Sequence, residues 1–255
     1  MPTAVSSAIA LPNRQLVRSK GAGTEHWCTD FIGRHAHGES TNGPETFLIE
    51  MSPHETILPH YHEVEQFQIF LAGAGRFGRK AAPPLTVHYV DRYTGYGPIR
   101  ATEHGYSYFV MHAEKDPGAV YRNRPGYRER IKPGRKRHLL VDGIATSTAP
   151  VLMARRESTL EPLFRPDDTD DGLGAFMWRL GPGMAAVGPK PEGTGGQFYL
   201  VVNGKLELNG ATYPAWSPIF VAPDEPALEV RAASDGVEAL VLQFPRSGSS
   251  IQRDD

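Results

Sequence analysis

The residues with the clearest capacity for chemistry are two histidines, His60 and His62, with a single residue between them. Side chains of a β-strand alternate between its two faces, so both imidazoles point the same way if this segment is extended. The same alternation puts Gln66 on the histidine face and turns Glu65 away from it. Neutral imidazole is a good ligand for Zn, Cu, Fe and Ni. The segment therefore predicts one side of a transition-metal site.

The residues after this pair form an apolar run that ends at Gly73. A histidine, any residue, a histidine, a short gap, a polar residue and a strand closing on glycine resembles the first motif of the cupin superfamily. Cupins have an acid at the position of Gln66, and Glu65 could substitute for it if the strand bulges. The resemblance implies an all-β fold of double-stranded β-helix (jelly-roll) barrels that hold a divalent transition metal.

A further ligand is implied by the second cupin motif, a histidine a few residues after a proline–glycine turn. Gly97 and Pro98 occupy the place of that turn, and His104 follows them. Alternatives for this last position are His112 and His88. The metal ligands that the resemblance implies are His60, His62, Gln66 and His104.

This ligand set has consequences for the metal. Three neutral nitrogens and an amide oxygen leave two positions of an octahedron open and place no charge against the ion. The metal would be a strong Lewis acid that favours anionic or enolate ligands. It would also be held less tightly than by a set that includes a carboxylate.

Open positions on a histidine-rich site allow a substrate and dioxygen to bind together. We therefore favour a non-haem Fe(II) dioxygenase that acts on a small aromatic or carbonyl-containing molecule. One alternative is a non-redox isomerase, lyase or hydrolase that uses Mn, Ni or Zn. Another is a small-ligand binding or sensor protein with a vestigial site. Cupins include all of these classes, so fold analogy does not choose among them.

Aromatic and cationic residues flank the expected second motif. Tyr96, Tyr106 and Tyr108 could offer a hydroxyl to a substrate, and Arg100 could hold a carboxylate in bidentate fashion. The competing interpretation is that the tyrosines fill a barrel core and the arginine is exposed. The candidate catalytic residues are Tyr106, Tyr108 and Arg100.

The two halves of the chain repeat the same pattern, which predicts two cupin domains in tandem. Gln66 and Gly73 recur as Gln197 and Gly204, 131 positions later. Three residues that precede these, Phe47, Pro53 and Leu58, match Phe176, Pro182 and Val187, which lie 129 positions later. The difference between the two offsets corresponds to a two-residue insertion in the second half. Pro189 and Pro191 stand at the positions of the two histidines, and proline cannot bind a metal. The sequence therefore predicts a metal only in the N-terminal barrel.

Changes in composition along the chain predict its segments. An arm that packs on a partner subunit or on the second half begins the chain, and eight Lys or Arg between residues 122 and 138 indicate a solvated linker. A second histidine pair, His35 and His37, lies in a glycine-rich stretch and is interpreted as a solvent-exposed loop. The expected segments are an arm and loop (1–45), an N-terminal barrel (46–113), a basic linker (114–145), a C-terminal barrel (146–247) and a tail (248–255).

Overall composition limits the partners. A net charge of −2 over 255 residues gives no nucleic-acid footprint. The single cysteine, Cys28, rules out an intramolecular disulfide framework and indicates a reducing compartment such as the cytoplasm. We expect no signal peptide and no membrane span. The resemblance also implies a homodimer, because cupin barrels often pair through their outer sheets.

Overall fold

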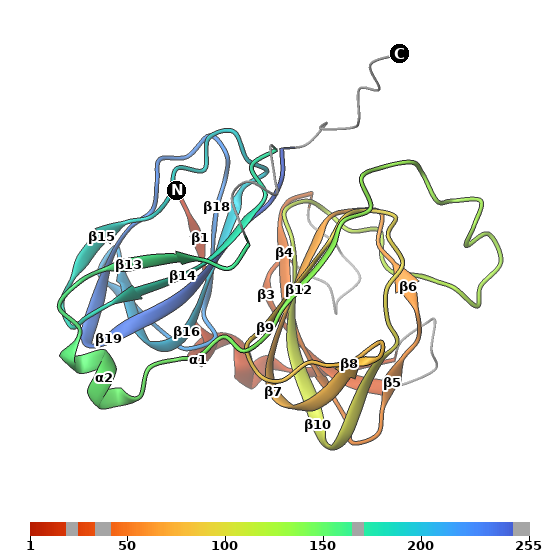
Figure 1. Ribbon diagram of the computed structural model, residues 1–255, viewed down its shortest axis with the longest axis horizontal. Coiled ribbons are helices and arrows are strands. Elements are labelled where there is room, and N and C mark those ends of the chain that lie inside the picture. Colours follow the sequence, from red (N-terminus) through yellow and green to blue (C-terminus); the bar gives the residue numbers. More distant parts are fainter. Residues whose placement is uncertain (19–24, 34–41, 165–170, 247–255) are drawn as a thin grey trace. The chain divides into compact units, whose positions relative to one another are not determined.

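A computed structural model describes residues 1–18, 25–33, 42–164 and 171–246 of the protein. It consists of antiparallel β-strands with two short α-helices, and it divides into two compact units (Figure 1). Asn13–Ile144 form the N-terminal barrel, while Ala145–Ser249 together with Met1–Pro12 form the C-terminal barrel. The pair His35 and His37 lies outside the described residues. Neither helix has the length or the run of apolar side chains with which a helix could cross a membrane.

The N-terminal barrel contains a nine-stranded sheet in which β12, β9, β7, β10, β4, β3 and β2 are neighbours in that order. Two further strands pair with it, β5 with β10 and β8 with β7, and β6 pairs separately with β11. The strands are β2 (Gln15–Arg18), β3 (Glu25–Ile32), β4 (Glu45–Met51), β5 (Thr56–Ile57), β6 (His60–Tyr61), β7 (Gln66–Phe77), β8 (Lys80–Ala81), β9 (Thr86–Val90), β10 (Ile99–His112), β11 (Val120–Tyr121) and β12 (His138–Val141).

The C-terminal barrel repeats this plan in an eight-stranded sheet. Its order is β1, β18, β16, β19, β14 and β13, with β15 paired to β19 and β17 paired to β16. The elements are β1 (Thr3–Ala4), α1 (Ser7–Ala10), α2 (Ala149–Ala154), β13 (Thr159–Pro162), β14 (Gly174–Leu180), β15 (Ala185–Val187), β16 (Gln197–Leu208), β17 (Ala211–Pro214), β18 (Pro218–Val221) and β19 (Glu229–Gln243); a 3-10 turn, Leu11–Asn13, follows α1.

Two long strands close each barrel, because each of them bends halfway along its length. In the N-terminal barrel the register between β7 and β10 slips where Gly73 meets the segment around Gly105. Both glycines have positive φ, and a Cβ on Gly73 would collide with the carbonyl oxygen of Gly105. Gly204 and Gly236 make the same close approach between β16 and β19. The tandem jelly-roll fold expected from the repeat is therefore confirmed.

Alternating side chains of the strands fill each barrel with its own core. The N-terminal core is rich in aromatic residues, among them Phe70, Phe77 and Tyr108, all of them buried. The C-terminal core is mainly aliphatic around Trp178 and Tyr199. Among the described residues, buried polar side chains are more numerous in the N-terminal barrel than in the C-terminal one.

The segment boundaries differ in part from those expected around the N-terminal barrel. Strand β1 pairs with β18, so the first residues pack on the second half, which is one of the two places expected for the arm, whereas β2 and β3 extend the sheet of the N-terminal barrel. The expected linker contains β11 and β12, which pair with β6 and β9. Its charges are tied to the barrel as well, since Arg137 pairs with Asp91 and Arg130 with Glu63. Residues 114–144 are therefore part of the barrel.

Candidate metal centre

The backbone of His60 is held on both sides. In strand β6 it pairs with Tyr121 of β11, and on its other edge it exchanges two hydrogen bonds with Tyr96, at 3.1 and 3.0 Å. The imidazole of His60 lies 4.5 Å from the Tyr96 ring and 5.2 Å from the Tyr121 ring, centroid to centroid. His60 thus has a fixed position inside the barrel.

Both histidines of the pair use Nδ1 to contact a hydrogen-bond acceptor. Nδ1 of His60 donates to the carbonyl oxygen of Leu58 at 2.7 Å, and Nδ1 of His62 donates to Oδ2 of Asp116 at 2.6 Å. A carbonyl and a carboxylate accept only, so each Nδ1 carries a proton, and in the neutral form of each ring the lone pair is on Nε2. The two rings lie 5.2 Å apart, centroid to centroid. This is the arrangement in which histidines bind metals, with the second nitrogen anchored by an oxygen.

Gln66, the first residue of β7, joins three elements of the site. Its side chain is fully buried; Nε2 donates to the hydroxyl of Tyr96 at 2.7 Å, and Oε1 accepts from Nε2 of His112 at 2.8 Å. Its inward orientation is the one expected, although bends at Glu63 and Val64 interrupt the strand between His62 and Gln66. Glu65 points away and forms two hydrogen bonds to Arg92, so it does not take the place of Gln66.

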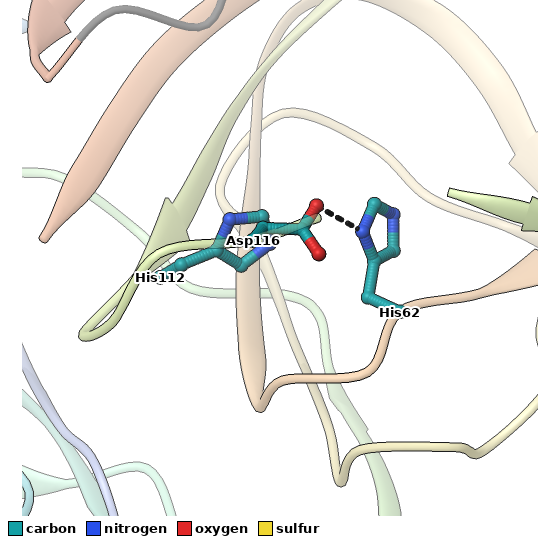
Figure 2. A group of neighbouring side chains, drawn as sticks. All are labelled: His62, His112 and Asp116. Atoms are coloured by element: carbon teal, nitrogen blue, oxygen red, sulfur yellow. Dashed lines mark hydrogen bonds and ion pairs between the residues drawn. The ribbon is translucent and has the colours of Figure 1, made fainter. Parts of the chain in front are cut away.

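A second set of possible ligands shares His62 (Figure 2). His62, His112 and Asp116 are buried and offer ligand atoms that all lie within 4.8 Å of one another. Figure 2 shows the carboxylate of Asp116 between the two imidazoles, with its bond to His62 drawn as a dashed line. Oδ1 of Asp116 and Nδ1 of His112 are buried without a hydrogen-bond partner among the described residues. The three side chains together could hold a metal ion.

The electrostatics of the site keep His60 uncharged. Burial, reinforced by the neighbouring His62, lowers the pKa of His60 to about 3. Burial alone would raise the pKa of Asp116, but His62 outweighs it and brings that pKa below the usual range. The site therefore presents a neutral imidazole and a carboxylate at neutral pH, which are the forms in which both side chains interact favourably with a cation.

His104 is not brought to the other expected ligands. It lies at the bend of β10 with 71% of its side chain exposed, beside Glu103, whereas His112 at the end of the same strand is buried next to Gln66. The structure therefore favours His112 over His104 as the histidine that completes the cluster. The shared parity of the two residues along the strand could not distinguish them, because the bend separates them.

The expected catalytic residues differ in their exposure to solvent. Arg100 is exposed on β10. Tyr106 is buried and donates to the carbonyl oxygen of Ala82, while its ring stacks on Phe70 at 4.9 Å. Tyr108 is buried in the same aromatic core. Arg100 is thus exposed, as the competing interpretation has it, and the two tyrosines belong to the core.

His88 is a further histidine buried in the N-terminal barrel. Its Nδ1 lies 2.9 Å from Oε1 of Gln68, its ring is 5.3 Å from that of Tyr96, and its Nε2 is buried without a partner among the described residues. Burial, with His138 nearby, holds the pKa of His88 well below its ordinary value. His88 is thus a neutral hydrogen-bonding group whose ring, like that of His60, lies beside Tyr96.

Sequence reasoning missed Asp116. The aspartate follows β10 by four residues, in a Lys-Asp-Pro-Gly turn that indicates only a break in the sheet. Such a turn folds back over the barrel here, and this places the carboxylate on His62. A polar residue in a turn after a strand gives no sequence signal that it contacts a histidine more than fifty residues away.

The C-terminal barrel has the equivalent scaffold without the ligands. Gln197 opens β16 as Gln66 opens β7, and its Nε2 donates to Oε1 of Gln243 at 2.8 Å, in place of the histidine contact. No residue from position 144 onward is a histidine. A hollow of about 590 Å³ lies between β15, β16, β17 and β19, and it is lined by residues such as Glu207, Glu229 and Arg231. Among the described residues, imidazoles gather only in the N-terminal barrel.

Several solved structures have a fold similar to that of this chain. No protein-family model matches the sequence, and no curated protein matches it. A protein of Nostoc punctiforme, described as a candidate dioxygenase, is similar with a TM-score of 0.60 and 12% identity over 99% of this chain and 81% of its own. Pirin YhhW of Escherichia coli in complex with nickel(II) has a TM-score of 0.58 and 14% identity, covering 96% of this chain and 99% of its own.

Oxalate decarboxylase of Bacillus subtilis is also similar, with a TM-score of 0.55 and 11% identity over 93% of this chain and 77% of its own. A further structure of this enzyme is described by its Mn(II) centres. Identities this low establish the fold alone. The chain thus has the all-β jelly-roll fold of the cupins, as its first motif predicts.

Proposed function

We propose that the N-terminal barrel binds a divalent transition metal through Nε2 of His60 and Nε2 of His62, and acts as a non-haem Fe(II) dioxygenase on a small organic molecule. The observation that carries this proposal is the hydrogen bonding of the two imidazoles. Leu58 and Asp116 each accept from an Nδ1, so Nε2 of each ring is the nitrogen whose lone pair can bind a metal. The cupin fold and its metal-containing structural neighbours support the same reading.

The residues of the site fit such an ion. A bound Fe(II) would supply a centre at which an organic substrate and dioxygen react. Asp116 orients His62, and Gln66 holds the hydroxyl of Tyr96 and the ring of His112. The aromatic rings of Phe77 and Tyr108 form the apolar lining beneath. Burial of all these groups excludes bulk water and strengthens their interactions with charge.

The test is anaerobic reconstitution with Fe(II), followed by oxygen uptake on a panel of catechols, diketones and hydroxyaromatic acids. We expect bound iron and uptake with at least one substrate in the wild type, and loss of both in His60→Ala. His104→Ala is the matched control, because that histidine is exposed, and it should behave as the wild type does. Bound iron without uptake across the panel would overturn the dioxygenase assignment.

A non-redox enzyme is the second candidate, because the donor atoms of the site also suit metals that do not activate dioxygen. Imidazole nitrogens and neutral oxygens accept Ni, Mn and Zn as well as Fe, and the structures of similar fold include nickel and manganese proteins. Metal analysis of protein purified without a histidine tag separates the two candidates. Full occupancy by Ni, Mn or Zn, with turnover that does not consume oxygen, would establish the non-redox enzyme.

A further inference from the structure

Tyr96 contacts both histidines of the pair. It lies opposite His60 in an antiparallel bridge, so both side chains project to the same face. Its ring is 4.5 Å from His60 and 6.3 Å from His62, with its plane only 16° from that of His62. Only 4% of the residue is exposed. Tyr96 therefore lies inside the site.

The hydroxyl of Tyr96 has unused bonding capacity. It accepts a hydrogen bond from Nε2 of Gln66 at 2.7 Å. Among the described residues, none accepts the proton of this hydroxyl. A buried hydroxyl normally finds partners for both of its roles. The oxygen of Tyr96 is thus held in place by one donor and has a second lone pair left for a cation.

The charge of the ligand set also favours a further ligand that is an anion. Imidazole binds a metal in its neutral form and Gln66 is an amide, so none of these three groups offsets the charge of the ion. A phenolate would supply one negative charge, and the amide N–H of Gln66 would stabilise it by a charge-assisted hydrogen bond. Phenolate oxygen from tyrosine is an established ligand of iron in proteins.

We propose that the oxygen of Tyr96 is the third protein ligand of the metal that His60 and His62 hold; this inference rests on the metal site proposed above. On binding, the phenol O–H bond breaks, the oxygen–metal bond forms and the proton leaves to solvent, with no change of oxidation state. Gln66 then acts as the positioning residue that holds the phenolate. The absent acid of the first motif is replaced by an anion from the segment between β9 and β10.

Visible spectroscopy of the iron-loaded protein tests this directly. The full chain is loaded with Fe(II), its iron content is measured, and it is then oxidised with ferricyanide. A phenolate bound to Fe(III) gives a charge-transfer band in the visible range, which imidazole and carboxylate ligands do not give. We expect the band in the wild type and its loss in Tyr96→Phe, with iron still bound by the two histidines but at least tenfold more weakly.

Tyr121→Phe is the matched control, because the Tyr121 ring also contacts His60, at 5.2 Å. That variant should keep the band. If Tyr96→Phe does not fold, resonance Raman spectra of the wild type, Tyr108→Phe and Tyr121→Phe must all retain the vibrations of a bound phenolate. Iron-loaded wild type without the band, or a band that survives in Tyr96→Phe, would overturn the ligand assignment and leave the metal site intact. A wild type that binds no iron would overturn both proposals.

Discussion

Asp116 determines which nitrogen of His62 can bind a metal. Its carboxylate is 8% exposed and accepts from Nδ1 at 2.6 Å, so Nε2 is left as the donor atom. The same carboxylate belongs to the set of His62, His112 and Asp116, in which it would bind the ion itself. The two roles predict different metal affinities for a substitution that removes the charge of Asp116 and keeps its shape.

Replacing Asp116 by Asn should weaken metal affinity by about 10–100-fold, the usual cost of losing an oxygen that orients a metal-bound histidine. The amide can still accept from His62, so the site should retain its metal at saturating concentration. Competition with a coloured chelator measures the affinity, and Glu114→Gln, an exposed neighbour, serves as the control. If Asp116→Asn abolishes binding while His60→Ala preserves it, the ion is held by His62, His112 and Asp116 instead.

Sequence alternation predicted which side chains of one segment share a face, but it did not predict which segments meet across the barrel. Alternation along a single segment placed His60, His62 and Gln66 on one face, and the structure groups them there. The choice between His104 and His112 depended on a bend in β10 that the sequence does not show. Asp116 and Tyr96 reach the site through pairings across the barrel, and no local pattern encodes those.

At the scale of elements, each barrel depends on the bend between its two long strands. The repeat predicted Gly73 and Gly204 as equivalent, and the structure explains why both are glycine. Each has a positive φ and packs against the carbonyl oxygen of a second glycine, Gly105 or Gly236. The short strands were not predictable, because pairs such as β6 and β11 are two residues long and owe their conformation to tertiary contacts.

Substituting Gly73 by Ala should lower the free energy of unfolding of the N-terminal barrel by about 2 kcal/mol or more. The added Cβ strains a left-handed backbone and collides with Gly105. Urea unfolding measures the loss, and Gly43→Ala is the control, since a Cβ there meets nothing within 4 Å. Equal stability of the two variants would show that β7 can bend without this close approach.

At the scale of the whole molecule, the two barrels share a fold and differ in their buried titratable groups. His60 and His88 are buried and uncharged in the N-terminal barrel, and the C-terminal barrel has no histidine. Its buried carboxylates include Glu238, whose hydrogen bonds from Asn203 and Ser147 outweigh burial and hold its pKa below the usual range. Mild acid should therefore act on one barrel and spare the other.

The folded N-terminal barrel keeps His60 unprotonated down to about pH 3, while the unfolded chain binds the proton near pH 6.5. The unfolded state therefore binds more protons below pH 6.5, and stability falls as the pH falls. Between pH 7 and pH 5 His60 alone should cost the metal-free barrel about 2 kcal/mol, and His88 adds to the loss in the same direction.

Hydrogen exchange at pH 7 and pH 5, corrected for intrinsic rates and followed by mass spectrometry, resolves the two barrels. Peptides from β7 and β10 should lose protection while those from β16 and β19 keep it, because the low pKa of Glu238 matters only below its ordinary range. His60→Gln should reduce the loss, since a group that never titrates cannot link folding to pH. Equal loss of protection in both barrels would show that acid acts through groups other than these histidines. Selective loss in the N-terminal barrel would show that the buried imidazoles of its metal site lower its stability in mild acid.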